Sequence, residues 1–246
     1  MNQSTNTPTV VLVHGGFADA SYWAPVIKEL QAHDVPVLAP PNPLRGLAHD
    51  AEYLASYVNQ IDGPVLLVGH SYGGAVISVA GASTPNAVGL VFVAAFVLDE
   101  GESFGEIFAK FGNTPLVGAV RPSTYPLENG STAMELTIAP ELYREAFAAD
   151  LPEDLTRILA ASQRPFAAIF EDRAAAAAWK TLPAWAVVAM SDNAIPPAAE
   201  RHMALRAGAQ PIEVDASHSI ALSQPKAVAE LIRTAAEAAT AVPIAV

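Results

Sequence analysis

Cysteine is absent from this 246-residue chain. Without thiols the protein has no disulfide, no cysteine nucleophile and no thiolate metal site. Basic residues are scarce as well: 13 Lys and Arg stand against 25 Asp and Glu, which gives a net charge of −12. No basic cluster offsets this charge, and an acidic surface repels phosphate backbones. We therefore expect no nucleic-acid partner.

Long apolar runs are also missing, although 52% of the residues are hydrophobic. No run approaches the roughly 20 residues of a membrane-spanning helix, so we expect no membrane partner. The first residues, MNQSTNTPT, have neither the charged nor the apolar region of a signal peptide, and we expect a cytoplasmic protein. The apolar share over this length predicts a single large α/β domain with a full core.

Short apolar runs alternate with helical patterns in both end regions of the chain. The runs expected as strands are Thr9–Val13, Val35–Ala39, Val65–Val68, Val88–Val97, Ala184–Met190 and Ala209–Val214. The expected helices are Ser21–His33 (capped by Ser21), Ala48–Gln60, Gly74–Ala82, Pro196–Ala207 and Ser219–Ala239. Such alternation, with strands apolar throughout, predicts a parallel sheet covered by helices on both faces.

The alternation stops between residues 99 and 182. Four short helical patterns occur there, at Ser103–Phe111, Pro140–Ala149, Pro152–Ser162 and Arg173–Lys180. The stretch Arg121–Ser131 is rich in Pro, Gly and Asn and is expected as a loop. We interpret residues 99–182 as an inserted helical cap on one domain, 1–246, whose core comprises residues 9–98 and 183–241.

The third expected strand leads into Gly69-His70-Ser71-Tyr72-Gly73, which fits the G-x-S-x-G pattern of a nucleophile elbow. In such an elbow the serine lies on a strained turn between strand and helix, and a side chain at either glycine would collide with the turn. The following helix directs its N-terminal N–H groups at negative charge near the serine. This placement favours Ser71 as a nucleophile over a glycine-flanked serine in an ordinary loop.

A serine hydroxyl needs a general base, and the base needs an orienting carboxylate. His218 follows the last expected strand by four residues, at the sheet edge where functional groups gather. Asp192 follows the preceding strand and is the favoured carboxylate. The alternatives are Asp99, Asp215 and Asp172.

Negative charge on an attacked carbonyl oxygen needs N–H donors, together called an oxyanion hole. The N–H of Tyr72, which follows the nucleophile, is one expected donor. The other should come from the loop His14-Gly15-Gly16-Phe17, where glycine lets the backbone approach a substrate closely. We favour Gly16, with Phe17 as its alternative, although a plain tight turn also fits this loop. His14 is expected to shape the turn, and the His70 side chain to point away from the pocket.

Together these motifs resemble the α/β-hydrolase superfamily over the whole chain. The resemblance rests on His14-Gly15-Gly16, Gly69–Gly74, Asp192-x-x-Ile195-Pro196 and His218, in the chain order serine, acid, histidine. The compact length and Ala216-Ser217-His218 look like the branch of plant methylesterases, hydroxynitrile lyases and bacterial esterases. The resemblance implies an α/β-hydrolase fold with a mainly parallel sheet of about six strands, because the two leading strands of larger members are absent.

Two departures separate this chain from the lyases of that branch. The lyases carry a lysine shortly after the catalytic histidine, where this chain has Ser219-Ile220-Ala221-Leu222. They also carry a threonine where this chain has Gly15. The resemblance therefore implies ester hydrolysis by a serine hydrolase. Lyase or perhydrolase chemistry on the same triad, and a ligand receptor with slow turnover, are the alternatives.

The pocket above Ser71 is expected to be apolar. Phe17 and Ile195 flank proposed catalytic groups, and Phe104 and Phe166 are the cap residues chosen to contact substrate, although their spacing also fits core packing. Further candidates from the cap are Phe108, Phe111, Phe147, Phe170 and the polar pair Gln163 and Arg164. Such a pocket suits a small hydrophobic or aromatic ester. We expect no metal and no cofactor, and we leave a homodimer open.

Overall fold

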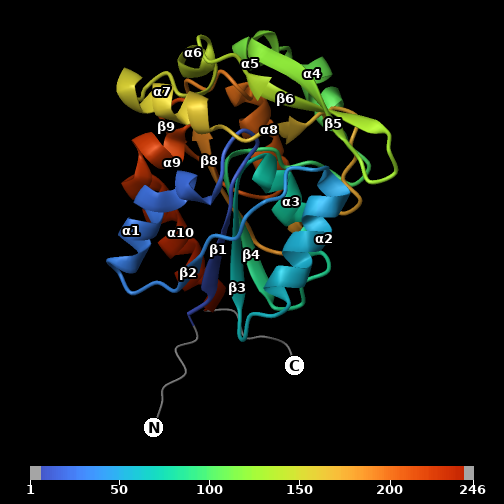
Figure 1. The fold of residues 1–246 in the computed structure, drawn as a ribbon. Coiled ribbons are helices and arrows are strands. Elements are labelled where there is room, and N and C mark those ends of the chain that lie inside the picture. Colours follow the sequence, from blue (N-terminus) through green and yellow to red (C-terminus); the bar gives the residue numbers. More distant parts are fainter. Residues whose placement is uncertain (1–6, 241–246) are drawn as a thin grey trace.

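The structure is a computed structural model that describes residues 7–240. Residues 1–6 and 241–246 lie outside the described part, including the expected core boundary at 241. A central sheet is flanked by helices on two sides, and a smaller layer of helices and strands covers one end of it (Figure 1).

The central sheet has six strands in the order β2-β1-β3-β4-β8-β9. The strands are β1 Thr9–Val13, β2 Val37–Leu38, β3 Val65–Ser71, β4 Ala87–Ala95, β8 Ala184–Ala189 and β9 Ile212–Val214. Every pairing in this sheet is parallel. All seven residues of β3 are buried, because helices cover both faces of a parallel sheet. The expected parallel sheet of about six strands is confirmed.

Alternate residues of each strand pack against opposite helical layers. Val10 and Leu12 of β1 belong to one core with helices α1 (Ala24–Gln31) and α10 (Pro225–Thr240). Val11 and Val13 belong to a second core. That core is shared with helices α2 Leu47–Val58, α3 Tyr72–Gly81 and α8 Pro197–Arg206. Figure 1 shows these two layers on either side of the sheet.

Two helix predictions are wrong in detail. The chain after β1 first forms a 3₁₀ turn, η1 (Ala20–Trp23), and the Asp19 side chain accepts the Ser21 N–H at 2.7 Å. Asp19 is therefore the cap that was expected at Ser21. The expected closing helix is divided into α9 (Ile220–Ser223) and α10. It breaks before Pro225, because proline disfavours a helical residue before it and lacks an N–H to continue the helix.

The prediction that residues 99–182 form a purely helical cap is also wrong. The segment contains helices α4 Phe104–Phe111, α5 Pro115–Ala119, α6 Tyr143–Phe147 and α7 Glu153–Ser162. It also contains an antiparallel sheet of three strands, β5 Val120–Pro126, β6 Thr132–Ile138 and β7 Phe166–Ala167. Most of the expected loop Arg121–Ser131 is thus strand β5. Its prolines suggested a loop, and they are tolerated because β5 is an edge strand. The expected helix Arg173–Lys180 is only a 3₁₀ turn, η2 (Ala178–Lys180).

Candidate active site

Ser71 occupies the strained turn that the glycine pattern predicts. It ends β3 and caps α3 with φ 54° and ψ −124°, a conformation that costs a non-glycine residue free energy. A Cβ atom on Gly69 would lie 2.4 Å from the Gly73 carbonyl oxygen, and one on Gly73 would lie 2.4 Å from that of Val13. The predicted elbow geometry is confirmed, because neither glycine tolerates a side chain.

The side chains of His218 and Asp192 are in direct contact. His218 Nδ1 donates to Asp192 Oδ2 at 2.5 Å, and both side chains are fully buried. The other carboxylate oxygen, Oδ1, accepts the N–H groups of Ala194 (2.6 Å) and Ile195 (2.9 Å). These hydrogen bonds hold the carboxylate in place and assign the ring proton to Nδ1.

The second ring nitrogen of His218, Nε2, is buried and has no hydrogen-bond partner among the described residues. The His218 ring packs edge-on against Phe147 at 4.7 Å between centroids. Phe147 and Ser71 line the same cavity. The free nitrogen thus belongs to a ring beside the serine's cavity, as a general base requires.

The three alternative acids have partners elsewhere. Asp99 is paired with Lys180 at 2.6 Å, and its side chain is 38% exposed. Asp215 accepts the Ser191 hydroxyl, and Asp172 accepts the backbone N–H of Leu47. The structure therefore brings Asp192, and none of these rivals, to His218.

The two other histidines near the site are neutral and structural. The Nε2–H of His70 donates to the carbonyl oxygen of His218 at 2.9 Å, and burial lowers the pKa of His70 well below its usual range. His14 donates from Nδ1 to the Gly15 carbonyl oxygen, and its Nε2 accepts the Asn42 N–H at 3.0 Å. Burial lowers the pKa of His14 to about 4. As expected, His14 shapes the turn, while His70 lies behind His218 and outside the cavity lining.

The glycine loop after β1 packs tightly against the serine. A Cβ atom on Gly15 would lie 2.6 Å from Ser71 Cβ, and one on Gly16 would lie 2.7 Å from the Phe166 ring. Phe17 then turns the chain with φ 62°. The expected oxyanion donor Gly16 lines the Ser71 cavity together with Tyr72, whose N–H begins α3.

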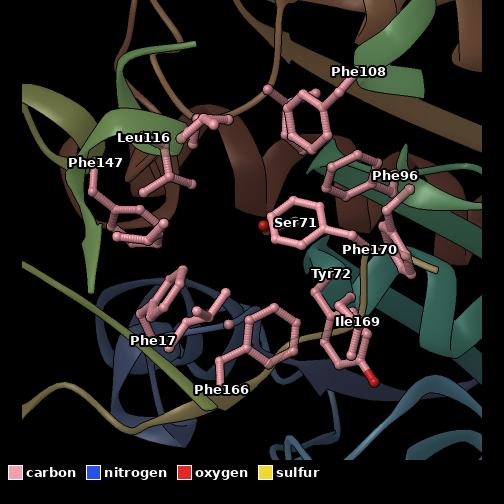
Figure 2. A pocket seen from close by; sticks show the side chains of 17 residues that line it. Phe17, Ser71, Tyr72, Phe96, Phe108, Leu116, Phe147, Phe166, Ile169 and Phe170 are labelled. Carbon is pink, nitrogen blue, oxygen red and sulfur yellow. The ribbon is translucent and has the colours of Figure 1, made fainter. Parts of the chain in front are cut away.

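A cavity adjoins Ser71 (Figure 2). Seven of the nine phenylalanines of the chain line it. Of the residues within 7–240 that line the cavity, only Ser71 and Tyr72 have polar side chains. The Tyr72 hydroxyl donates to Asp50 at 2.7 Å. The Ser71 hydroxyl is thus the polar side-chain group that this lining offers to a ligand.

The expected substrate-binding residues line this cavity. All four chosen residues are present, and so are three of the further candidates: Phe17, Ile195, Phe104, Phe166, Phe108, Phe147 and Phe170. Phe111 packs against His202 instead. Gln163 bonds the backbone of Ile138, and Arg164 bonds the Asn42 carbonyl oxygen, so neither polar candidate joins the lining.

Sequence reasoning missed several contributors to the site, among them Phe96 and Asp50. Phe96 follows β4 and lines the cavity, so its place at a strand end was an available signal. Asp50 is fully buried on α2, where it accepts the Tyr72 hydroxyl and the Arg45 N–H. Burial raises the pKa of Asp50. The sequence feature that could have indicated Asp50 is a carboxylate on the apolar face of α2, beside Ala51 and Leu54.

Two further features concern ions and membranes. Within residues 7–240 no group of three or more His, Asp or Glu side chains is arranged to hold a metal ion. None of the described helices is long and apolar enough to cross a membrane. The cytoplasmic location and the homodimer stay predictions.

The comparison with known families agrees with the geometry of the elbow. Residues 10–231 match the model of the alpha/beta hydrolase family. The chain belongs to this family. The resemblance inferred from the motifs is thereby confirmed.

Relatives of this α/β-hydrolase carry esterase and hydrolase names. The putative chloroplastic methylesterase 11 of Arabidopsis thaliana is 26% identical over an alignment of 242 residues, and the match covers 90% of this chain and 62% of that protein. The chain thus spans less than two thirds of that relative. Polyneuridine aldehyde esterase has a TM-score of 0.80 at 21% identity, covering 93% of this chain and 99% of its own. A pyrethroid hydrolase from Sphingobium faniae JZ-2 has a TM-score of 0.77 at 21% identity, covering 94% and 98%. These two structures share the fold.

Proposed function

We propose that this α/β-hydrolase is a carboxylesterase-type serine hydrolase with Ser71 as nucleophile, His218 as base and Asp192 as orienting acid. The observation that carries the proposal is the buried Asp192–His218 hydrogen bond beside a strained serine in an apolar cavity. The methylesterase and hydrolase names of its relatives support ester cleavage.

The first half of the reaction forms an acyl-enzyme. Ser71 Oγ attacks the ester carbonyl carbon, and its proton passes to His218 Nε2. The Asp192 carboxylate stabilises the imidazolium that results. The carbonyl oxygen becomes an oxyanion that accepts hydrogen bonds from the N–H groups of Gly16 and Tyr72. When the tetrahedral intermediate collapses, the bond to the alcohol oxygen breaks, and that oxygen takes the proton from Nε2.

The second half releases the acid. Water attacks the acyl carbonyl carbon and gives a proton to His218 Nε2, which passes it to Ser71 Oγ as the acyl bond breaks. The products are one carboxylic acid and one alcohol, and the enzyme is regenerated. Each step uses groups of this chain, so the proposal includes no cofactor.

The lining of the cavity defines the substrate class. Among the described residues no lysine or arginine lines it, so a charged carboxylate or phosphate would lose its hydration without gaining a charged partner. Seven phenylalanine rings instead favour a small hydrophobic or aromatic ester. The same lack of a lining cation argues against cyanohydrin cleavage, because no charge would stabilise a departing cyanide ion.

A fluorophosphonate probe and a panel of aryl esters, alkyl esters, lactones, amides and cyanohydrins test the proposal. The wild-type protein should be labelled at Ser71 and should hydrolyse apolar esters, whereas Ser71→Ala should be unlabelled and at least about 10³-fold slower. Undiminished hydrolysis by Ser71→Ala would overturn the nucleophile. Cyanohydrin cleavage without ester hydrolysis would favour a lyase, and tight binding without turnover would favour a receptor.

A further inference from the structure

The cap holds the loop of His218 on both sides of the histidine. Before it, the Ser217 N–H donates to Asp150 Oδ2 at 3.1 Å, and the Ser217 hydroxyl makes a short hydrogen bond to Asp150 Oδ1. After it, the Ser219 hydroxyl donates to the carbonyl oxygen of Phe147 at 2.8 Å. Asp150 and Phe147 lie on α6 and the turn that follows it. One short cap segment therefore holds the two residues that flank His218.

The same segment also faces the proposed substrate. The Phe147 ring lines the cavity near Ser71 (Figure 2) and packs edge-on against the His218 ring. The turn behind it is braced by two hydrogen bonds, from the Leu151 N–H to the Ala148 carbonyl oxygen and from Arg144 Nε to that of Leu151. These hydrogen bonds restrict movement of the turn, and thereby of the His218 loop that is bonded to it.

The contact between Ser217 and Asp150 is a strong one. Ser217 is only 2% exposed, whereas Asp150 lies at the surface. Both donors of the buried serine end on this one carboxylate, and a charged acceptor forms stronger hydrogen bonds than a neutral one. If the carboxylate were removed, two buried donors would lose their partner and the loop would shift toward water.

We propose that Asp150 is a positioning residue for His218, and that it acts through Ser217 to keep the free Nε2 directed at Ser71. The inference rests on the proposed function, in which His218 is the base. On this proposal the cap helps to position the catalytic base, because a movement of the segment from Phe147 to Asp150 would also move His218. Asp150 itself is not among the described residues that line the cavity, and its carboxylate accepts hydrogen bonds from Ser217.

The test compares Asp150→Ala with Asp154→Ala. Asp154 is an exposed residue of α7, so its removal makes the same charge change away from the base loop. Asp150→Ala should lower kcat for an aryl ester about tenfold and change KM less than about twofold, since misplacement of the base affects the chemical step. Asp154→Ala should match the wild type. Asp150→Asn should recover part of the loss, because its amide oxygen still accepts one bond from Ser217.

A second readout needs no substrate. The proton between His218 Nδ1 and Asp192 gives a downfield NMR signal, which should broaden or vanish in Asp150→Ala and persist in Asp154→Ala. If Asp150→Ala does not fold, Ser217→Ala takes its place, with an expected fall in kcat of about threefold. The proposal is overturned if the folded variant keeps both kcat and the signal, or if KM rises while kcat is unchanged. If the wild type hydrolyses no ester, the proposed function fails, and the signal still decides whether Asp150 positions His218.

Discussion

The carboxyl groups of Glu200 and Asp192 lie side by side in the protein interior. Glu200 is on α8, and its Oε2 accepts the N–H of Ala189, at the end of β8. Burial and the charge of Asp192 raise the pKa of Glu200 well above its ordinary value of 4.5. Glu200 thus remains protonated at pH values where an exposed glutamate would be charged.

This pair makes stability depend on pH in a defined direction. Above pH 4.5 the unfolded chain releases the Glu200 proton while the folded protein retains it, so stability falls as pH rises toward the folded pKa. Below pH 4.5 the contribution is fully present. Each pH unit inside this window costs up to about 1.4 kcal/mol. Glu200→Gln keeps an acceptor for Ala189 and does not titrate. The free energy of unfolding of Glu200→Gln, measured in urea, should therefore gain on that of the wild type as the pH rises above 4.5. Stability curves that stay parallel with pH would contradict the assignment.

The choice of Asp192 over Asp99 is tested by matched amide substitutions. Asp192→Asn removes the charged acceptor of the His218 Nδ1–H and should lower kcat by about 10³–10⁴. Asp99→Asn breaks only a surface pair with Lys180 and should leave kcat within about twofold. The measurement is steady-state hydrolysis of an aryl ester by each folded variant. The opposite ranking would assign the orienting role to Asp99.

The close packing of Gly16 gives a prediction about the oxyanion hole. In Gly16→Ala the new Cβ would lie 2.7 Å from the Phe166 ring, so the ring or the loop must shift. We expect the loop to shift and to displace an N–H donor. We expect kcat/KM for an aryl ester to fall about 10²-fold. In a Phe166→Ala background the same change should cost less than about threefold, because the obstructing ring is gone. An equal cost in both backgrounds would show that the loop, and not the ring, excludes the side chain.

Local physical rules made part of the fold and site predictable. The strands read as apolar runs because both faces of a parallel sheet are buried. The glycines on either side of Ser71 identified the elbow. A Cβ atom at Gly69 or Gly73 would lie 2.4 Å from a backbone oxygen, so these positions require glycine. His218 and Asp192 were found because they follow late strands, and the carboxyl ends of parallel strands meet at one edge.

Other features depend on contacts between distant segments, which a pattern in one segment does not record. The cap strands β5 and β6 pair with each other, and β5 tolerates prolines because its outer edge is unpaired. Asp50 on α2 was not predicted, because it acts by accepting a hydrogen bond from Tyr72, a residue of another helix. The raised pKa of Glu200 follows from its burial and from its position beside Asp192.

The sequence by itself thus determined the parallel sheet, the strained serine and the order of the catalytic candidates, because apolar runs and glycine constraints act over a few residues. The tertiary structure alone decided which aspartate meets His218, which phenylalanines enclose the cavity and how Asp150 of the cap reaches the base loop. Each of these depends on packing between residues far apart in the chain. Burial also shifts the pKa values of His14, His70 and Glu200 toward their neutral forms, since removal from water disfavours the charged form of a carboxyl or imidazole group.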